Sequence, residues 1–268
     1  MKLYSATVLS VLLSSSLFAQ QTTVSVNNSS DKLIVAVSWY QHSAEMRALY
    51  YQGFNIARQR LDEAIAANTK KQPLAVVVDI DETMLDNSPF ESMVIDSADN
   101  LSGWKNWTAR ATAKALPGAL EFAIYAQSKK VEIFYVTNRD DNERVATLLN
   151  LQKEGFPYAT EDHLLTRSDL SYSAGNTSSK TGRRAKVAEN HKIVLLIGDN
   201  LNDFSEIFED RSHNDGKEAV EKNREQFGQL FIVLPNPMYG AWEKPLYNYK
   251  DGLSEEQKTL MLKEKLVK

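Results

Sequence analysis

Apolar residues recur along the chain in two patterns. Between residues 43 and 65 they return every three or four positions, which predicts one long amphipathic helix. Elsewhere they form short runs rich in Val and Ile without alternation, which is typical of strands covered on both faces. Such runs occupy residues 74–78, 131–136, 193–197 and 231–234. We therefore predict four buried strands, preceded by a long helix.

Stretches with helical character separate these strands. They cover residues 117–128, 143–153 and 180–190. Gly155 is placed to end the second of them. Alternating strands and helices predict an α/β fold with a parallel sheet, flanking helices and right-handed crossovers. Residues 254–257 read Ser-Glu-Glu-Gln, a capping box that predicts a last helix, whereas the polar residues 20–32 predict a loose arm.

The first 19 residues have the layout of a secretory signal peptide. Lys2 precedes an apolar, Ser-spaced run at residues 3–18, and Ala19 offers a small residue for cleavage. The run is shorter than the roughly 20 residues of a spanning helix. A buried N-terminal helix or a retained anchor is the alternative. No Cys follows to carry an acyl anchor, so we predict a mature protein in the periplasm or outside the cell without a membrane anchor.

Composition narrows the classes of function. The 268 residues are 43% hydrophobic and 25% charged, as in an ordinary globular chain. The formal net charge is −4 and there is no basic block, which argues against a nucleic-acid polymer as partner. The absence of Cys excludes zinc fingers, thioredoxin-type enzymes, iron–sulfur proteins and cysteine hydrolases. We predict one domain over residues 20–268 with a cap-like insertion around 90–116; the sequence does not predict an oligomeric state.

Polar residues follow three of the predicted strands. Ligands bind at the carboxyl ends of the strands in an open parallel sheet, so these residues are candidates for a site. They are Asp79 and Asp81 after the first strand, Thr137, Asn138 and Arg139 after the second, Asp199 and Asp203 after the third, and Lys180 at the start of a helix. An Asp-x-Asp pair alone is also common in turns and helix caps. The prediction of a site rests on all four elements together.

These residue types suit phosphoryl transfer. Carboxylates of Asp79 and Asp199 are the ligands that Mg²⁺ prefers, and a chain with four His and no Cys offers less to Zn²⁺. An Asp beside that metal can attack phosphorus and form an aspartyl-phosphate. Asp81 could protonate the leaving oxygen and later deprotonate water.

Cationic and hydrogen-bonding groups complete this hypothesis. Thr137 and Lys180 would bind the phosphoryl oxygens, with Asn138 beside them. Arg139 could reach the phosphate or pair with a nearby acid. The predicted substrate is a small phosphate monoester.

Two long motifs resemble those of the haloacid dehalogenase (HAD) superfamily and, within it, the class C nonspecific acid phosphatases. Residues 77–87 read Val-Val-Asp-Ile-Asp-Glu-Thr-Met-Leu-Asp-Asn, and residues 198–204 read Gly-Asp-Asn-Leu-Asn-Asp-Phe. The similarity extends over residues 38–39, 117–119 and 235–242. Phe90 stands where the family usually has Tyr. The resemblance implies a HAD-like Rossmannoid fold and an acidic pH optimum.

The resemblance also implies roles for individual residues. Asp79 is the expected nucleophile, Asp81 the acid and base, and Thr137 and Lys180 the phosphate binders. The expected Mg²⁺ ligands are the Asp79 and Asp199 side chains and the Asp81 backbone carbonyl. Asp203 is expected to support them.

Four aromatic residues could recognise a substrate. They are Trp104, Trp107, Tyr239 and Trp242. A surface on which a nucleobase stacks and ordinary core packing are equally compatible with them. Class C relatives with such aromatics favour nucleoside monophosphates, so the resemblance implies a 5′-nucleotidase. A phosphate- or nucleotide-binding protein without turnover, and a phosphotransferase that passes the phosphoryl group to an alcohol, are the alternatives.

Overall fold

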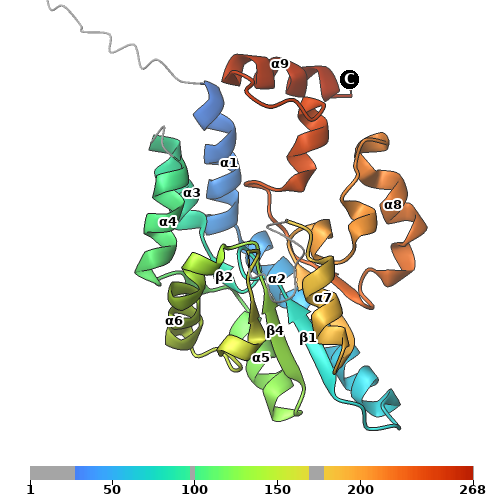
Figure 1. Cartoon of the computed structure of the whole chain (residues 1–268). Coiled ribbons are helices and arrows are strands. Elements are labelled where there is room, and N and C mark those ends of the chain that lie inside the picture. The colour runs from blue at the N-terminus through green and yellow to red at the C-terminus, as the bar shows by residue number, and fades with distance from the viewer. Residues whose placement is uncertain (1–27, 97–99, 169–177, 268) are drawn as a thin grey trace, which may run out of the picture.

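The computed structural model describes residues 28–96, 100–168 and 178–267 (Figure 1). The predicted signal peptide at 1–19 and residues 20–27 of the predicted arm lie outside the described residues. No helix among the described residues is long and apolar enough to cross a membrane.

A parallel five-stranded sheet lies at the centre, in the order β5-β4-β1-β6-β7. Its strands are β1 (Leu74–Val78), β4 (Glu132–Val136), β5 (Leu164–Leu165), β6 (Lys192–Gly198) and β7 (Phe231–Val233). The four predicted strands and the α/β fold class are confirmed. The edge strand β5 has only two residues, too few to produce a hydrophobic pattern. All five residues of β1 are buried, as expected of the middle strand.

Helices cover both faces of the sheet. On one face Val76 and Val78 pack with α2 (Ala44–Ala67), α5 (Ala119–Ser128) and α6 (Arg144–Glu154). On the other, Ala75 and Val77 pack with α7 (Thr181–Ala188) and the segment that follows β6. Two predicted boundaries are confirmed, because Gly155 at φ 85° ends α6 and a capping box at Ser254 starts α9 (Glu255–Lys265).

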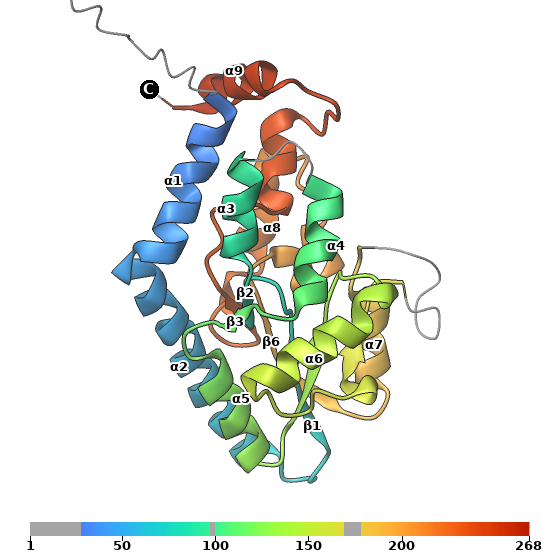
Figure 2. The same cartoon turned by 90° about the vertical axis from the view of Figure 1, so that its left-hand side faces the viewer.

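The prediction of a loose arm over residues 20–32 is wrong for its last part. Helix α1 (Asn28–His42) begins within it, packs beside α3 (Ser88–Asp96), and contacts α9 (Figure 2). Val37 and Tyr40 in the second half of α1 are buried, and the Tyr40 hydroxyl hydrogen-bonds with that of Tyr50 in α2. Tertiary packing of this second half, rather than its polar start, therefore accounts for the helix.

Residues 88–96 and 100–110 form two helices over the sheet. The helices are α3 (Ser88–Asp96) and α4 (Asn100–Arg110). In the sequence they lie between two short strands, β2 (Leu85–Asp86) and β3 (Lys114–Ala115), which pair with each other in antiparallel orientation. The two helices stand side by side near the carboxyl ends of the strands (Figure 2). The remaining helices include α8 (Lys217–Lys222) and the 3₁₀ segments η3 (Leu201–Asp203) and η7 (Ala241–Tyr247).

Candidate active site

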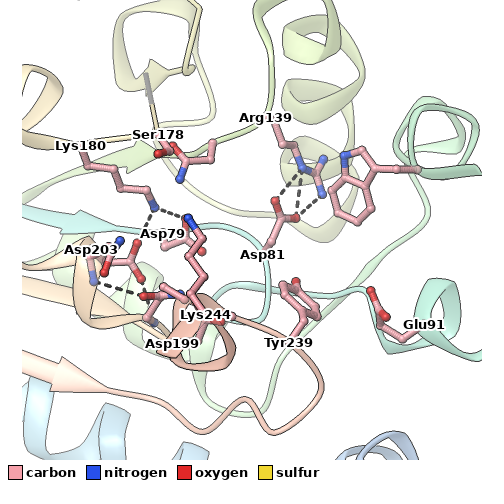
Figure 3. A pocket seen from close by; sticks show the side chains of 16 residues that line it. Asp79, Asp81, Glu91, Arg139, Ser178, Lys180, Asp199, Asp203, Tyr239 and Lys244 are labelled. Carbon is pink, nitrogen blue, oxygen red and sulfur yellow. Dashed lines mark hydrogen bonds and ion pairs between the residues drawn. The ribbon is translucent and has the colours of Figure 1, made fainter. Parts of the chain in front are cut away.

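A pocket of about 440 Å³ opens at the carboxyl ends of β1, β4 and β6 (Figure 3). Seven of the polar residues predicted from the sequence line it: Asp79, Asp81, Asn138, Arg139, Lys180, Asp199 and Asp203. Its volume falls in the range of about 300–1,000 Å³ that is common for small-molecule sites. The parallel sheet thus brings together side chains that lie up to 124 positions apart in the sequence, from Asp79 to Asp203.

At one end of the pocket, Lys180 lies between two carboxylates. Its ammonium forms ion pairs with Asp79 and, at 2.7 Å, with Asp203. All three side chains are buried. Burial disfavours the charged ammonium, but the two carboxylates outweigh this and raise the pKa of Lys180. Lys180 is therefore a fixed positive charge beside Asp79.

Three carboxylates crowd this end. Oxygens of Asp79, Asp199 and Asp203 all lie within 4.8 Å of one another. Burial, with repulsion by Asp203 and Asp81, outweighs Lys180 and raises the pKa of Asp79 from 3.8 to about 7. Burial and repulsion by Asp203 and Asp79 likewise raise the pKa of Asp199. Negative charge here exceeds what one ammonium balances, so the cluster fits a divalent cation that binds oxygen ligands.

Asp203 differs from Asp199, because both of its oxygens have protein partners. Oδ1 pairs with Lys180, and Oδ2 accepts a hydrogen bond from the Asn200 amide at 3.0 Å. A Cβ atom at Gly198 would lie 2.2 Å from Asp203 Oδ2, so this position requires glycine. By contrast, Asp199 Oδ2 accepts only the Asn236 amide, at 2.8 Å, among the described residues.

Asp81 lies beside this cluster in a different setting. The buried Arg139 donates from Nη2 to Asp81 Oδ1 at 2.7 Å and from Nε to Oδ2 at 3.2 Å. Asn87 Nδ2 donates to Oδ1 at 2.8 Å. Of the two roles open to Arg139 in the sequence, the structure has the pairing with an acid. Such a fork fixes both the position and the plane of the carboxylate.

Asn138 lines the pocket, whereas Thr137 is fully buried outside the lining. The Thr137 hydroxyl accepts a hydrogen bond from the Arg139 amide at 3.1 Å. Arg183, also buried, donates to the Thr137 carbonyl, to Asn138 Oδ1 at 2.8 Å and to the Ser179 carbonyl at 2.9 Å. Arg183 thereby ties the end of β4 to the segment that carries Lys180.

This geometry agrees with comparisons to known proteins. A family model described as HAD superfamily, subfamily IIIB (acid phosphatase), matches residues 3–242. The chain belongs to this family. Its fold is similar to the class C acid phosphatase from Bacillus anthracis, at 39% identity and a TM-score of 0.82 over 90% of this chain and 98% of that one. The resemblance drawn from the two Asp motifs is thus confirmed.

Two further relatives are similar over different extents. A structure of the B. anthracis class C enzyme with tungstate bound gives 39% identity and a TM-score of 0.81, over 89% of this chain and 98% of that one. Acid phosphatase 1 from Solanum lycopersicum is 29% identical over 133 residues, which are 48% of this chain. That match spans 51%, about half, of the tomato protein's length.

In this subfamily IIIB member, the four aromatics take different positions. Trp104 and Tyr239 line the pocket. Trp107 does not: it is buried, and its Nε1 donates to Asn87 Oδ1 at 2.8 Å. Trp242 is 40% exposed outside the lining, and its Nε1 donates to the Tyr239 carbonyl at 3.2 Å. Of the four aromatics that could form a surface for stacking, only Trp104 and Tyr239 therefore line the pocket.

Phe90, where the family usually has Tyr, is buried against Trp104. Their ring centres lie 5.2 Å apart in an edge-to-face arrangement. The ring of Phe90 thus supports a residue of the pocket wall.

Glu82 is a site residue that the sequence reasoning missed. It follows Asp81 with a positive φ of 55° and is fully buried. Its carboxyl accepts a hydrogen bond from the Asn87 amide at 2.7 Å and another from the Tyr239 hydroxyl. Burial, with repulsion by Asp81 and Asp199, raises its pKa well above the usual value. Glu82 therefore connects the Asp79–Asp81 loop to the aromatic wall of the pocket, which Trp104 and Tyr239 form. The sequence signal that could have identified Glu82 is its position in the first Asp motif, directly after Asp81.

Proposed function

We propose that this chain is a Mg²⁺-dependent acid phosphatase that prefers nucleoside 5′-monophosphates. The observation that carries the proposal is one pocket end that holds the Asp79 carboxylate, the Lys180 ammonium and, beside them, the oriented Asp81. Family membership supports it. So does the B. anthracis enzyme with tungstate, a tetrahedral oxyanion like phosphate.

The reaction has two displacements, both carried by residues of the β1 loop. In the first, Asp79 attacks phosphorus, the bond to the ester oxygen breaks, and the Asp81 carboxyl gives its proton to the departing alcohol. In the second, Asp81 takes a proton from water as that water attacks phosphorus. The bond to Asp79 then breaks, which releases phosphate and restores both carboxyls.

Lys180 and Arg139 have separate supporting roles in this reaction. The Lys180 ammonium offsets negative charge on the phosphoryl oxygens as Asp79 attacks. The Arg139 fork keeps Asp81 in one orientation for both proton transfers.

A divalent cation fits beside these groups. The side chains of Asp79 and Asp199 and the carbonyl of Asp81 would hold Mg²⁺, with Asp203 positioning Lys180 and the Asn200 amide. When bound, Mg²⁺ would supply positive charge to the phosphoryl group. The oxygen-only donor set favours Mg²⁺ over softer metals.

The wall of the pocket supports the proposed preference for nucleotides. Trp104 and Tyr239 line it together with the carboxylates, so an ester whose phosphate lies near Lys180 can place an aromatic base against these rings. We also propose that residues 1–19 direct export and are removed, which the N-terminal sequence of the protein recovered outside the cytoplasm would test.

Kinetics with purified protein test the function. Hydrolysis of p-nitrophenyl phosphate and of nucleoside 5′-monophosphates is measured with Mg²⁺ and with EDTA, for the wild type and Asp79→Asn. We expect wild-type turnover that requires metal and that Asp79→Asn abolishes. Tight nucleotide binding without turnover would instead indicate a binding protein. A new monophosphate after addition of a nucleoside would indicate a phosphotransferase, because alcohols and water compete for the same intermediate.

A further inference from the structure

One residue of the pocket wall, Glu91, has no role in the proposed reaction. Glu91, in the first turn of α3, lines the pocket at the end opposite Lys180, and Figure 3 shows Asp81 and Tyr239 between the two. The groups that suit a phosphate lie at the Lys180 end. An ester with its phosphate there would extend its organic part past Tyr239 toward Glu91.

The Glu91 carboxyl has no protein partner within residues 28–96, 100–168 and 178–267. No hydrogen bond or ion pair reaches it from these residues. Each of the four Asp carboxylates in the pocket, in contrast, has at least one partner. Lys244, which also lines the pocket, forms no ion pair with Glu91, and Figure 3 shows its side chain extending toward the Asp79 end.

We infer that Glu91 selects esters whose organic part carries hydroxyl or amino groups, such as the sugar or base of a nucleoside. The inference rests on the proposed phosphatase function and narrows its substrate class. A hydroxyl or amino group would pair with the carboxyl oxygens. A bare apolar group would instead cover the carboxyl without pairing it, which carries a desolvation cost.

The surroundings of Glu91 strengthen this selection. Burial and the nearby Glu243 raise the pKa of Glu91 to about 7. Near neutral pH the group is therefore present both as carboxylate and as neutral acid, so it can accept or donate a hydrogen bond. Glu91 is partly buried, and a polar group that a substrate covers and pairs with rejects an analogue without that partner more strongly than an apolar pocket rejects a change in size.

The test compares three substrates that differ in these groups. Adenosine 5′-monophosphate carries sugar hydroxyls and a base amino group, its 2′,3′-dideoxy analogue keeps only the amino group, and phenyl phosphate has neither. We measure kcat/KM for wild type, Glu91→Leu, Glu91→Gln and the control Glu121→Gln. Glu121 is an exposed carboxylate in the first turn of α5, so its loss removes the same helix-terminus charge far from the pocket.

We expect Glu91→Leu to lower the ratio of kcat/KM for the nucleotide to that for phenyl phosphate about tenfold or more. Glu91→Gln, which keeps a hydrogen-bonding side chain, should restore part of the ratio, and Glu121→Gln should not change it. A loss confined to the ribonucleotide would place the sugar hydroxyls at Glu91. A loss shared by the dideoxy analogue would place the base amino group there.

Other outcomes would overturn the inference. If Glu91→Leu lowers kcat/KM equally for all three substrates, Glu91 only supports the fold or the chemistry. If the ratio of kcat/KM for the nucleotide to that for phenyl phosphate is unchanged, Glu91 does not discriminate between substrates. If wild type hydrolyses none of the three, the proposed function fails. Calorimetric titration of wild type and Glu91→Leu with both nucleotides then still decides whether Glu91 discriminates between them.

Discussion

Asp79 and Asp81 lie two positions apart on one loop, yet the structure surrounds them differently. Asp79 has two further carboxylates near it and a single ammonium, so its end of the pocket has an excess of negative charge. Asp81 has a guanidinium fork, which balances its charge and, together with the Asn87 side-chain amide, fixes its plane. In the proposed reaction, these surroundings would prepare identical side chains for different tasks, Asp79 to bind cation and phosphorus and Asp81 to move protons.

The largest effect should come from the Asp79 end. Asp79→Asn keeps the size of the side chain but removes the proposed nucleophile and one charge of the proposed metal site. We expect kcat/KM to fall about 10⁴-fold or more, as for other enzymes that lose a nucleophile. The matched control is Asp162→Asn, which makes the same substitution at an exposed carboxylate that forms no hydrogen bond among the described residues. Near-normal turnover by Asp79→Asn would refute the assignment of the nucleophile.

A smaller effect should come from the Asp81 end. Arg139→Lys keeps the positive charge but loses the fork, because an ammonium does not offer two parallel N–H donors in one plane. We expect kcat to fall about 100-fold with less than a threefold change in KM, since only the orientation of Asp81 is lost. A double variant with Asp81→Asn should be no slower than Asp81→Asn alone. If KM rises while kcat is kept, Arg139 contacts the substrate instead.

Circular dichroism must accompany this measurement. Arg139 is buried and its Nη1 also donates to Thr147 at 3.2 Å, so a folding defect could imitate a catalytic one. A native spectrum and an unchanged melting temperature separate the two.

The charge excess at the Asp79 end should also appear in the stability of the metal-free protein. A carboxyl whose pKa is raised in the folded state, from 3.8 to about 7 for Asp79, contributes stability that is present below pH 4 and lost as pH rises to about 7. The raised pKa of Asp199 acts in the same direction. Lys180 adds no slope here, because its raised pKa lies above this window.

We therefore expect the melting temperature in EDTA to fall between pH 5 and 8, and Mg²⁺ to raise it by roughly 3–6 °C at pH 8 but less at pH 5. Differential scanning fluorimetry measures both. Asp199→Asn should flatten the pH dependence and weaken the effect of Mg²⁺. A stabilisation by Mg²⁺ that is equal at both pH values would show that the ion binds elsewhere.

The sequence predicted the Asp79 end better than the Asp81 end, for a physical reason. Strand runs and the residues that follow them are local signals, and a parallel sheet brings strand ends to one edge whatever else the chain does. Asp79 and Asp199 were found in this way, and Lys180 from its place at the start of a predicted helix. The partner of Asp81 is 58 positions distant, and an arginine after a strand can turn toward a phosphate or toward an acid.

The residues above the sheet were harder to predict, because helix packing decides which side chains reach the pocket. Trp104 and Trp107 are one helical turn apart on α4, yet one lines the pocket and the other is buried against Asn87. Glu91 carried no motif. Its position became visible only once α3 was placed over the strand ends.

The smallest expected effect concerns the hydrogen bond between Tyr239 in the pocket wall and Glu82 in the loop after β1. Tyr239→Phe keeps an aromatic ring in the pocket but removes the hydroxyl that donates to Glu82. A ring less firmly held should raise KM for nucleoside 5′-monophosphates about threefold, as the loss of one hydrogen bond would, while kcat falls less than twofold. Tyr249→Phe, whose hydroxyl accepts a hydrogen bond from the Arg211 amide away from the pocket, is the matched control. A tenfold fall in kcat would instead mean that the Tyr239–Glu82 contact positions the Asp79–Asp81 loop itself, so that the aromatic wall and the proton-transfer end act as one unit.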